Sequence, residues 1–180
     1  DGQISAFPVA ENVHINGILH STTVPSIAAE SLQQTAIEMA STIAEGLRYV
    51  GTMAVEFFVS KQGDIIANEI APRPHNSGHY TLDACRTSQF EQQVRMLCGL
   101  TAGNAELISP VVMINLLGDV WGNSQPHWDK LLAQPDIKLH LYGKKEARAG
   151  RKMGHFNVLS ADASQAMELA SQTFEAIKAD

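Results

Sequence analysis

The stretch TMAVEFFVSKQGDIIANEIA, residues 52–71, contains two strand-like runs separated by a turn. Residues 52–59 and 65–70 are rich in β-branched and aromatic side chains, which favour strands. Between them, the sequence KQGD at 61–64 has the composition of a short turn. The stretch therefore predicts an antiparallel hairpin, the best-determined element of the sequence.

Each strand of this hairpin carries one glutamate. Glu56 interrupts an otherwise apolar run, and Glu69 lies near the end of the partner run. Because the turn folds the strands back on each other, the two carboxylates can approach across the ladder, where like charges destabilise. A hard divalent cation, with phosphate oxygens completing its shell, would remove this repulsion. The alternative is that one glutamate faces solvent while the other pairs with Arg73.

The residues before the hairpin predict a second hairpin or a meander, followed by a helix. Two short apolar stretches, residues 4–9 and 13–19, surround the turn signal Asn16-Gly17, which suggests a hairpin or a meander. Apolar positions then recur at helical spacing over residues 28–47. Ser31 and Gln34 have the spacing of a capping box at the start of that helix.

The residues after the hairpin predict a loop, a helix and then a β-rich region. Residues 71–83 are rich in Pro, Asn, Ser, Gly and His, which is typical of a loop. A helix is expected over 88–97, with Phe90, Val94 and Leu97 on one side. Three strands and two helices follow, over 111–117, 137–142 and 153–159, and over 128–132 and from 162 onward.

These elements predict an α+β fold with a soft boundary between Gly99 and Pro110. Residues 1–103 would form an antiparallel sheet with packed helices. Residues 104–180 would form a small β-rich domain with a terminal helix, whose apolar face includes Ala166, Ala170, Phe174 and Ile177.

The composition excludes several classes of function. At 44% hydrophobic and 18% charged residues, the 180-residue chain can form a sizeable core. Its net charge of −6 argues against a nucleic-acid partner, and no apolar run is long enough to span a bilayer. Cys85 and Cys98 lack metal-ligand spacing, so we interpret them as reduced, buried thiols of a cytoplasmic protein. Because Asp1-Gly2 opens directly into a strand-like segment, we expect a piece of a longer protein.

The segment APRPHNSGH, residues 71–79, is unusually dense in polar side chains. His75 and His79 lie four positions apart, a spacing at which two histidines can bind zinc from one face of a helix. The sequence Asn76-Ser77-Gly78 after a proline disfavours a helix. Hydrogen bonding is therefore preferred over zinc binding or proton transfer for both histidines.

A basic loop near the C-terminus is the second candidate site. Residues 143–152 contain two glycines and a group of cations in an otherwise acidic chain: Lys144, Lys145, Arg148, Arg151 and Lys152. Glycine allows close backbone approach, and guanidinium groups supply paired donors to phosphate oxygens. The loop is therefore a candidate phosphate site, although composition alone favours a solvated loop.

Three motifs resemble one family. NEIAPRPHNSGH at 68–79 resembles the metal-and-substrate signature of the ATP-grasp ligases. FPVAENVH at 7–14 and GRKMGH at 150–155 resemble, within that superfamily, the N5-carboxyaminoimidazole ribonucleotide synthases, the ATPase subunits of phosphoribosylaminoimidazole carboxylase. The resemblance runs along essentially the whole chain and implies the C-terminal half of an ATP-grasp ligase of purine synthesis.

The resemblance also implies the reaction. ATP and bicarbonate would give carboxyphosphate, and the amine of 5-aminoimidazole ribonucleotide would then be carboxylated, with release of ADP and phosphate. The implied cofactors are ATP and Mg²⁺, with Mn²⁺ as a substitute. The implied partners are these small molecules, and the full-length protein would be a homodimer.

The roles of individual residues follow from the same resemblance. Glu56 and Glu69 would ligate the metal, and Asn68 would lie beside the nucleotide. Arg73 would meet the transferred phosphoryl group. The bicarbonate and imidazole pocket and the 5′-phosphate site would be formed by two further sets: His75, Asn76, Ser77 and His79, and Lys145, Arg148, Arg151 and Lys152.

Two alternatives remain at this point. One is another ATP-grasp ligase, either a formyl-phosphate-using transformylase or a relative of biotin carboxylase, against which the motif at 150–155 argues. The other is a non-catalytic scaffold module, which would show no magnesium-dependent affinity for adenine nucleotides. The resemblance further implies that the glycine-rich loop and the lysines holding ATP lie upstream, so the isolated chain should have weak turnover or none.

Overall fold

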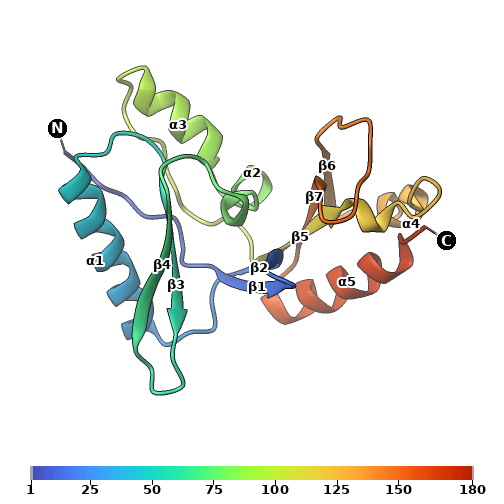
Figure 1. Cartoon of the computed structure of the whole chain (residues 1–180). Coiled ribbons are helices and arrows are strands. Elements are labelled where there is room, and N and C mark those ends of the chain that lie inside the picture. Colours follow the sequence, from blue (N-terminus) through green and yellow to red (C-terminus); the bar gives the residue numbers. More distant parts are fainter. Residues whose placement is uncertain (1, 180) are drawn as a thin grey trace. The chain divides into compact units, whose positions relative to one another are not determined.

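The computed structural model describes residues 2–179, which form two compact units (Figure 1). The first unit comprises Asp1–Glu11 and Ser26–Ile108, and the second comprises Asn12–Pro25 and Ser109–Asp180. The early segment 12–25 therefore belongs to the same unit as the C-terminal part of the chain. The family-domain boundary between residues 103 and 104 stays a prediction.

The first unit combines a two-stranded hairpin with helices, as predicted. Helix α1 packs against both strands of the hairpin. The hairpin pairs along its length, from Ala54 opposite Ala71 to Val59 opposite Ile65. The elements of this unit are α1 (Glu30–Leu47), β3 (Ala54–Val59), β4 (Ile65–Ala71), the 3₁₀ helix η1 (Asn76–Gly78), α2 (Thr81–Ala84) and α3 (Gln89–Leu97).

Three local predictions for this unit were wrong. Residues 2–10 form no strand; the first strand begins at Glu11. Helix α1 begins at Glu30 without a side-chain cap, because Ser31 already lies inside the helix and cannot act as its N-cap. The segment 71–83 is not entirely loop, since it contains η1 and the start of α2.

The second unit is built on a five-stranded sheet in the order β1-β2-β5-β7-β6. The Asn16-Gly17 turn joins β1 to β2 as predicted, and both turn residues have positive φ. The predicted strands and helices after Pro110 are all present. The elements are β1 (Glu11–Ile15), β2 (Ile18–Val24), β5 (Val111–Leu117), the 3₁₀ helix η2 (Gly118–Val120), α4 (Trp128–Leu132), β6 (Ile137–Leu141), β7 (Lys152–Leu159) and α5 (Ala163–Ala176).

The core of the second unit lies between this sheet and helix α5 (Figure 1). Alternate residues of the central strands, such as Ile114 and Phe156, face the helix and are buried. On the helix, Ala166 and Ala170 are fully buried, as the apolar pattern predicted. Within residues 2–179, no helix has both the length and the apolar character needed to cross a membrane.

Replacing Gly46 with alanine is expected to stabilise the chain. Gly46 lies inside α1, and a Cβ at this position would meet nothing within 4 Å. Alanine should therefore raise the free energy of unfolding by about 0.5–1 kcal/mol. Urea denaturation would measure this. The matched Gly17→Ala change should act in the opposite direction, because Gly17 has a φ of +75°. Destabilisation by both changes would contradict the prediction.

The two cysteines differ in environment. Both are free, but Cys85 is buried and Cys98 is exposed, so the expectation of two buried thiols was wrong for Cys98. Burial raises the pKa of the Cys85 thiol to about 11. Since the thiolate is the reactive form, iodoacetamide at mildly alkaline pH should modify Cys98 roughly 100-fold faster than Cys85. Peptide mass spectrometry over time would measure both rates, and similar rates would contradict this assignment.

Candidate active site

The two glutamates of the hairpin lie directly opposite each other, as predicted. Glu56 on β3 is the register partner of Glu69 on β4. The next pair joins Phe57 to Ala67, so Asn68 is an extra residue that forms a β-bulge. The register thus opposes two like charges, with Asn68 beside them in an irregular part of the ladder.

Within residues 2–179, the ion-pair contact recorded for this pair comes from a histidine and not from an arginine or a lysine. The Glu56 side chain is 14% exposed, and its Oε1 lies 3.9 Å from Nδ1 of His75. The Arg73 guanidinium instead donates from Nη1 to the carbonyl oxygen of Pro74, at 3.1 Å. Within residues 2–179, no ion pair joins Arg73 to either glutamate. The alternative in which Arg73 pairs with one of them is therefore wrong.

The donor set fits magnesium better than zinc. Among the described residues, no group of three or more His, Cys, Asp or Glu side chains could hold a metal ion. A structural zinc site needs about four protein ligands. Magnesium is commonly held by one or two carboxylates, with phosphates and waters completing its shell. Glu56 and Glu69 supply such a pair of hard oxygen donors.

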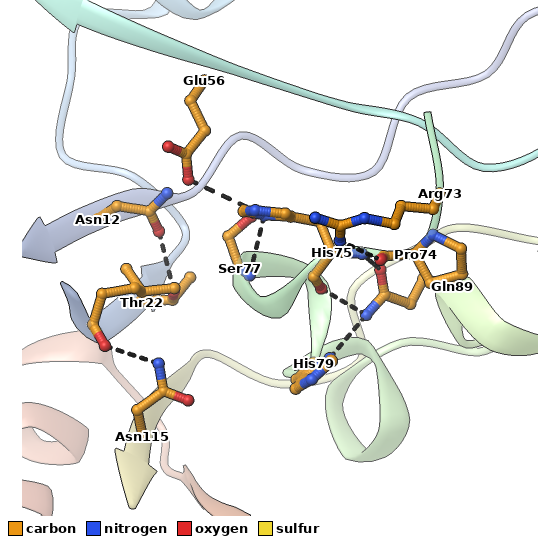
Figure 2. Close-up of polar contacts among 11 residues, drawn as sticks. Asn12, Thr22, Glu56, Arg73, Pro74, His75, Ser77, His79, Gln89 and Asn115 are labelled. Atoms are coloured by element: carbon orange, nitrogen blue, oxygen red, sulfur yellow. Dashed lines mark hydrogen bonds and ion pairs between the residues drawn. The ribbon is translucent and has the colours of Figure 1, made fainter. Parts of the chain in front are cut away.

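The 3₁₀ helix η1 determines how the two histidines are placed. His75 is its N-cap: Nδ1 accepts from the backbone N–H of Ser77 and lies 2.8 Å from the Ser77 hydroxyl oxygen. His79 is the C-cap at the other end of η1. The two side chains therefore leave from opposite ends of a short helix, which is not the one-face arrangement of a zinc site (Figure 2).

Asn76 carries an unpaired amide in a buried position. The residue is 7% exposed, and both Nδ2 and Oδ1 are buried without a hydrogen-bond partner within the described residues. Leaving such groups unpaired costs about 1–3 kcal/mol each, so they need an explanation. An amide that presents N–H donors next to an oxygen acceptor suits a small planar ligand with both kinds of group.

Gln89 belongs to this site, and sequence reasoning missed it. Its side-chain amide contacts both His75 and His79, and the residue is 2% exposed. The sequence placed Phe90, Val94 and Leu97 together on one side of α3, and such an apolar side is normally the buried one. In fact Phe90 and Val94 are exposed, whereas Gln89 and Gln92 are buried. The only available signal was the cluster of glutamines at 89, 92 and 93.

The basic loop belongs to the second unit. Hydrogen bonds to residues 118 and 119 hold its last part, at Gly150 and Arg151. The Gly118 N–H donates to the carbonyl oxygen of Arg151 at 2.9 Å. The Gly150 N–H donates to the carboxylate of Asp119 at 2.8 Å. A Cβ on Gly118 would lie only 2.1 Å from the carbonyl oxygen of Arg148, so the loop depends on a glycine at position 118.

The cations of the loop are not equivalent. Arg148 pairs with the carboxylate of Glu146, while Arg151 donates to the Glu146 carbonyl oxygen at 3.1 Å. Lys144 donates to the carbonyl oxygen of Lys152. Lys145 is exposed and forms no ion pair within residues 2–179. Lys145 is therefore better placed than Arg148 to meet an added phosphate.

Tyr142, which directly precedes this loop, is partly exposed and contacts the buried ring of His155. The Tyr142 hydroxyl is 2.9 Å from Nδ1 of His155, whose ring stacks on His140 at 4.6 Å. Burial raises the pKa of Tyr142 to about 12, so its hydroxyl keeps its proton at neutral pH. His155 is 1% exposed, which fits a supporting role better than contact with a ligand.

The structure thus brings the predicted residues together as two groups. Glu56, Asn68, Glu69, Arg73 and the residues from His75 to His79 lie in the first unit. Lys145, Arg148, Arg151 and Lys152 lie in the second unit. The binding role of each residue stays a prediction.

Two family models match the chain. The ATP-grasp domain matches residues 1–90, and the phosphoribosylaminoimidazole carboxylase C-terminal domain matches residues 111–169. Among curated relatives, an N5-carboxyaminoimidazole ribonucleotide synthase of Bacillus subtilis is 47% identical over 159 residues, covering 88% of this chain and 41% of the relative. The chain thus spans less than half the length of that relative.

Solved structures of the same enzyme class are also similar. The N5-carboxyaminoimidazole ribonucleotide synthetase from Thermotoga maritima is 41% identical with a TM-score of 0.88, covering 98% of this chain and 48% of that one. The synthase from Aspergillus clavatus, in complex with ADP and 5-aminoimidazole ribonucleotide, is 29% identical with a TM-score of 0.84. It covers 94% of this chain and 47% of that one.

Proposed function

Since this chain belongs to the ATP-grasp family and, within it, to the N5-carboxyaminoimidazole ribonucleotide synthases, we propose that its protein carboxylates 5-aminoimidazole ribonucleotide. ATP and bicarbonate are the co-substrates, and N5-carboxyaminoimidazole ribonucleotide, ADP and phosphate are the products. The observations that carry the proposal are the opposed Glu56–Glu69 pair and the unpaired amide of Asn76, which follows His75, the residue 3.9 Å from Glu56.

The first step joins bicarbonate to the terminal phosphoryl group of ATP. A bicarbonate oxygen attacks the phosphorus, and the bond to ADP breaks, giving carboxyphosphate. Mg²⁺ bound by Glu56 and Glu69 would neutralise charge on the phosphate oxygens. Arg73 is exposed, and guanidinium donors not engaged with Pro74 can stabilise charge on the transferred phosphoryl group.

Asn76 is suited to orient bicarbonate. Its Oδ1 can accept from the bicarbonate hydroxyl while its Nδ2 donates to a carboxylate oxygen, a planar two-point contact that satisfies both buried groups. The second step then joins the substrate amine to the carboxyl carbon, with loss of phosphate and of one amine proton. His75, Ser77 and His79, which lie in or cap η1 together with Asn76, are the neighbouring polar groups available to this step.

The C-terminal match favours this reaction over the alternatives. Residues 111–169 match the C-terminal domain of phosphoribosylaminoimidazole carboxylase. This match supports neither a transformylase nor a relative of biotin carboxylase. The basic loop lies within this region and would hold the 5′-phosphate of the ribonucleotide. A homodimeric assembly and a cytoplasmic location remain predictions from the family.

A chimaera tests the proposal directly. This chain would replace the matching segment of the Bacillus subtilis relative, and ADP release would be measured with each substrate omitted in turn. The expected result is ADP release that requires both bicarbonate and the aminoimidazole ribonucleotide. A folded chimaera that releases ADP without either substrate, or only with formate, would contradict the proposal. The chain alone should show little or no turnover.

Loss of Lys152 should weaken ribonucleotide binding in this chimaera. A phosphate contact by a cation is charge-assisted, so Lys152→Ala should raise KM for the ribonucleotide by roughly 10-fold while KM for ATP stays unchanged. The control is Lys138→Ala, which removes the same charge from an exposed position on β6. Equal effects of the two changes would show that net charge, and not a phosphate site, explains the result.

A further inference from the structure

Helix α3 presents amides to the interior of its unit. An amphipathic helix normally buries its apolar side. Here the buried residues of α3 are Gln89 and Gln92, whereas Phe90, Val94 and Leu97 are 39%, 58% and 70% exposed. A buried glutamine is retained only where its amide is satisfied, so these two side chains have specific partners.

The amide of Gln89 is clamped on the backbone of His75. The His75 N–H donates to Oε1 at 2.8 Å, and Nε2 donates to the His75 carbonyl oxygen at 2.7 Å. A backbone N–H can only donate and a carbonyl oxygen can only accept, so these two bonds fix which end of the amide is the nitrogen. The clamp is visible in Figure 2.

The same nitrogen also faces His79. Nε2 of Gln89 lies 2.9 Å from Nδ1 of His79 (Figure 2). An amide nitrogen carries two hydrogens and donates both, one to the His75 carbonyl and one to this ring nitrogen. A proton on Nδ1 would set two donors against each other. Nδ1 must therefore be an acceptor, which leaves the ring proton of neutral His79 on Nε2.

We propose that Gln89 is a positioning residue that holds His79 as the Nε2–H tautomer, so that His79 acts toward the substrate as a hydrogen-bond donor. The substrate in this statement rests on the proposed function; the tautomer does not. In the carboxylation step, His79 would donate from Nε2 to an oxygen of the carboxyl group. The amine proton released in that step would go to another acceptor. Nε2 of His79 could accept it only in the Nδ1–H tautomer, which the Gln89 donor disfavours.

The surroundings of Gln89 hold the amide in this orientation. Its backbone N–H donates to the Thr81 hydroxyl at 2.9 Å, and its carbonyl oxygen accepts from the Thr52 hydroxyl at 3.1 Å. A Cβ on Gly78 would lie 2.5 Å from Oε1 of Gln89, so the glycine of the PHNSGH segment leaves the space that the amide occupies. The His79 ring also packs on Phe90, with centroids 5.4 Å apart.

The chain supplies a matched control in Gln92. Its amide makes the same two-point contact with a backbone, accepting from the Gly103 N–H at 2.9 Å and donating to the Gly103 carbonyl oxygen at 2.7 Å. Gln92 is also buried, at 6% exposure. A change at Gln92 therefore removes an equivalent clamp from the same helix but leaves the amide on His79 in place.

Nitrogen-15 NMR of histidine-labelled chain tests the inference. Long-range proton–nitrogen correlations distinguish the protonated ring nitrogen from the unprotonated one, and a His79→Asn sample assigns the signals. In the wild-type chain, the Nε2–H tautomer of neutral His79 should exceed the other by at least ~10-fold. Gln89→Glu should invert the ratio, since a carboxylate at the same place accepts from Nδ1–H. Gln92→Glu should leave it unchanged.

Several outcomes would overturn the inference. A wild-type His79 protonated on Nδ1 would contradict it, and so would an unchanged ratio in a folded Gln89→Glu chain. If that variant does not fold, Gln89→Met keeps the length of the side chain without its donors, and the ratio should then fall toward unity. Because no substrate is present, these results are independent of whether the chimaera carboxylates the ribonucleotide.

Discussion

Alanine at position 118 is expected to displace the basic loop and to lower the free energy of unfolding by about 3 kcal/mol. The added Cβ would lie 2.1 Å from the carbonyl oxygen and 2.6 Å from the nitrogen of Arg148. Both are backbone atoms, so no rotamer change can relieve the overlap. The loop must move away, which also breaks the bond from the Gly118 N–H to the Arg151 carbonyl oxygen.

Two measurements check this expectation. Urea denaturation gives the loss of stability, and amide hydrogen exchange at Gly150 and Arg151 reports whether the loop has been released. The control is Gly143→Ala in the same region: Gly143 has a φ of +68°, but a Cβ there meets nothing within 4 Å. This control should cost only the ~1 kcal/mol of a strained backbone. A smaller loss for Gly118→Ala than for Gly143→Ala would contradict the close approach.

Replacing Glu69 with glutamine should abolish most activity while making the chain more stable. In the chimaera, kcat/KM should fall by roughly 100-fold or more, because one of two oxygen ligands of the metal loses its charge. In the chain without ligand, the same change removes a like-charge pair directly across a hairpin. The free energy of unfolding should then rise by about 0.2–1 kcal/mol.

The opposite signs of these two effects make the prediction specific. A scaffold role for the glutamates would give the stability gain without a loss of activity. A packing role would give a loss of both. The charge-matched control is Glu38→Gln, at an exposed position in the middle of α1 and away from both helix ends, which should change neither activity nor stability appreciably. Steady-state ADP release and thermal unfolding of the same preparations give the two readings.

The hairpin and its carboxylates could be predicted because their signals are local. The turn composition and the two apolar runs indicate a hairpin, and one glutamate in each run indicates that the carboxylates can approach; the structure pairs Glu56 with Glu69. The bulge at Asn68 could not be predicted in the same way, because a one-residue insertion leaves no mark on the apolar pattern. The predicted capping box at the start of α1 was wrong. Ser31 and Gln34 have capping-box spacing, but the same residues can also lie inside a helix, as they do here.

The residues that complete the site are set by contacts distant in sequence. Gln89 meets a backbone 14 positions away, and Asp119 meets a backbone 31 positions away. Neither contact changes composition or periodicity near either partner. Helix α3 was placed correctly, but which of its sides is buried depends on the amide partners of its glutamines and not on its apolar stripe.

The position of segment 12–25 has a consequence for how the chain is made. Strand β2 pairs with β5, so β2 is synthesised about 90 residues before its partners, as for Ser21 opposite Ile114. The second unit therefore has a high contact order and should fold late on the ribosome. A product limited to residues 109–180 would leave one side of β5 unpaired, an edge that invites aggregation. The C-terminal family domain, residues 111–169, therefore differs from the compact unit that folds, which also includes residues 12–25.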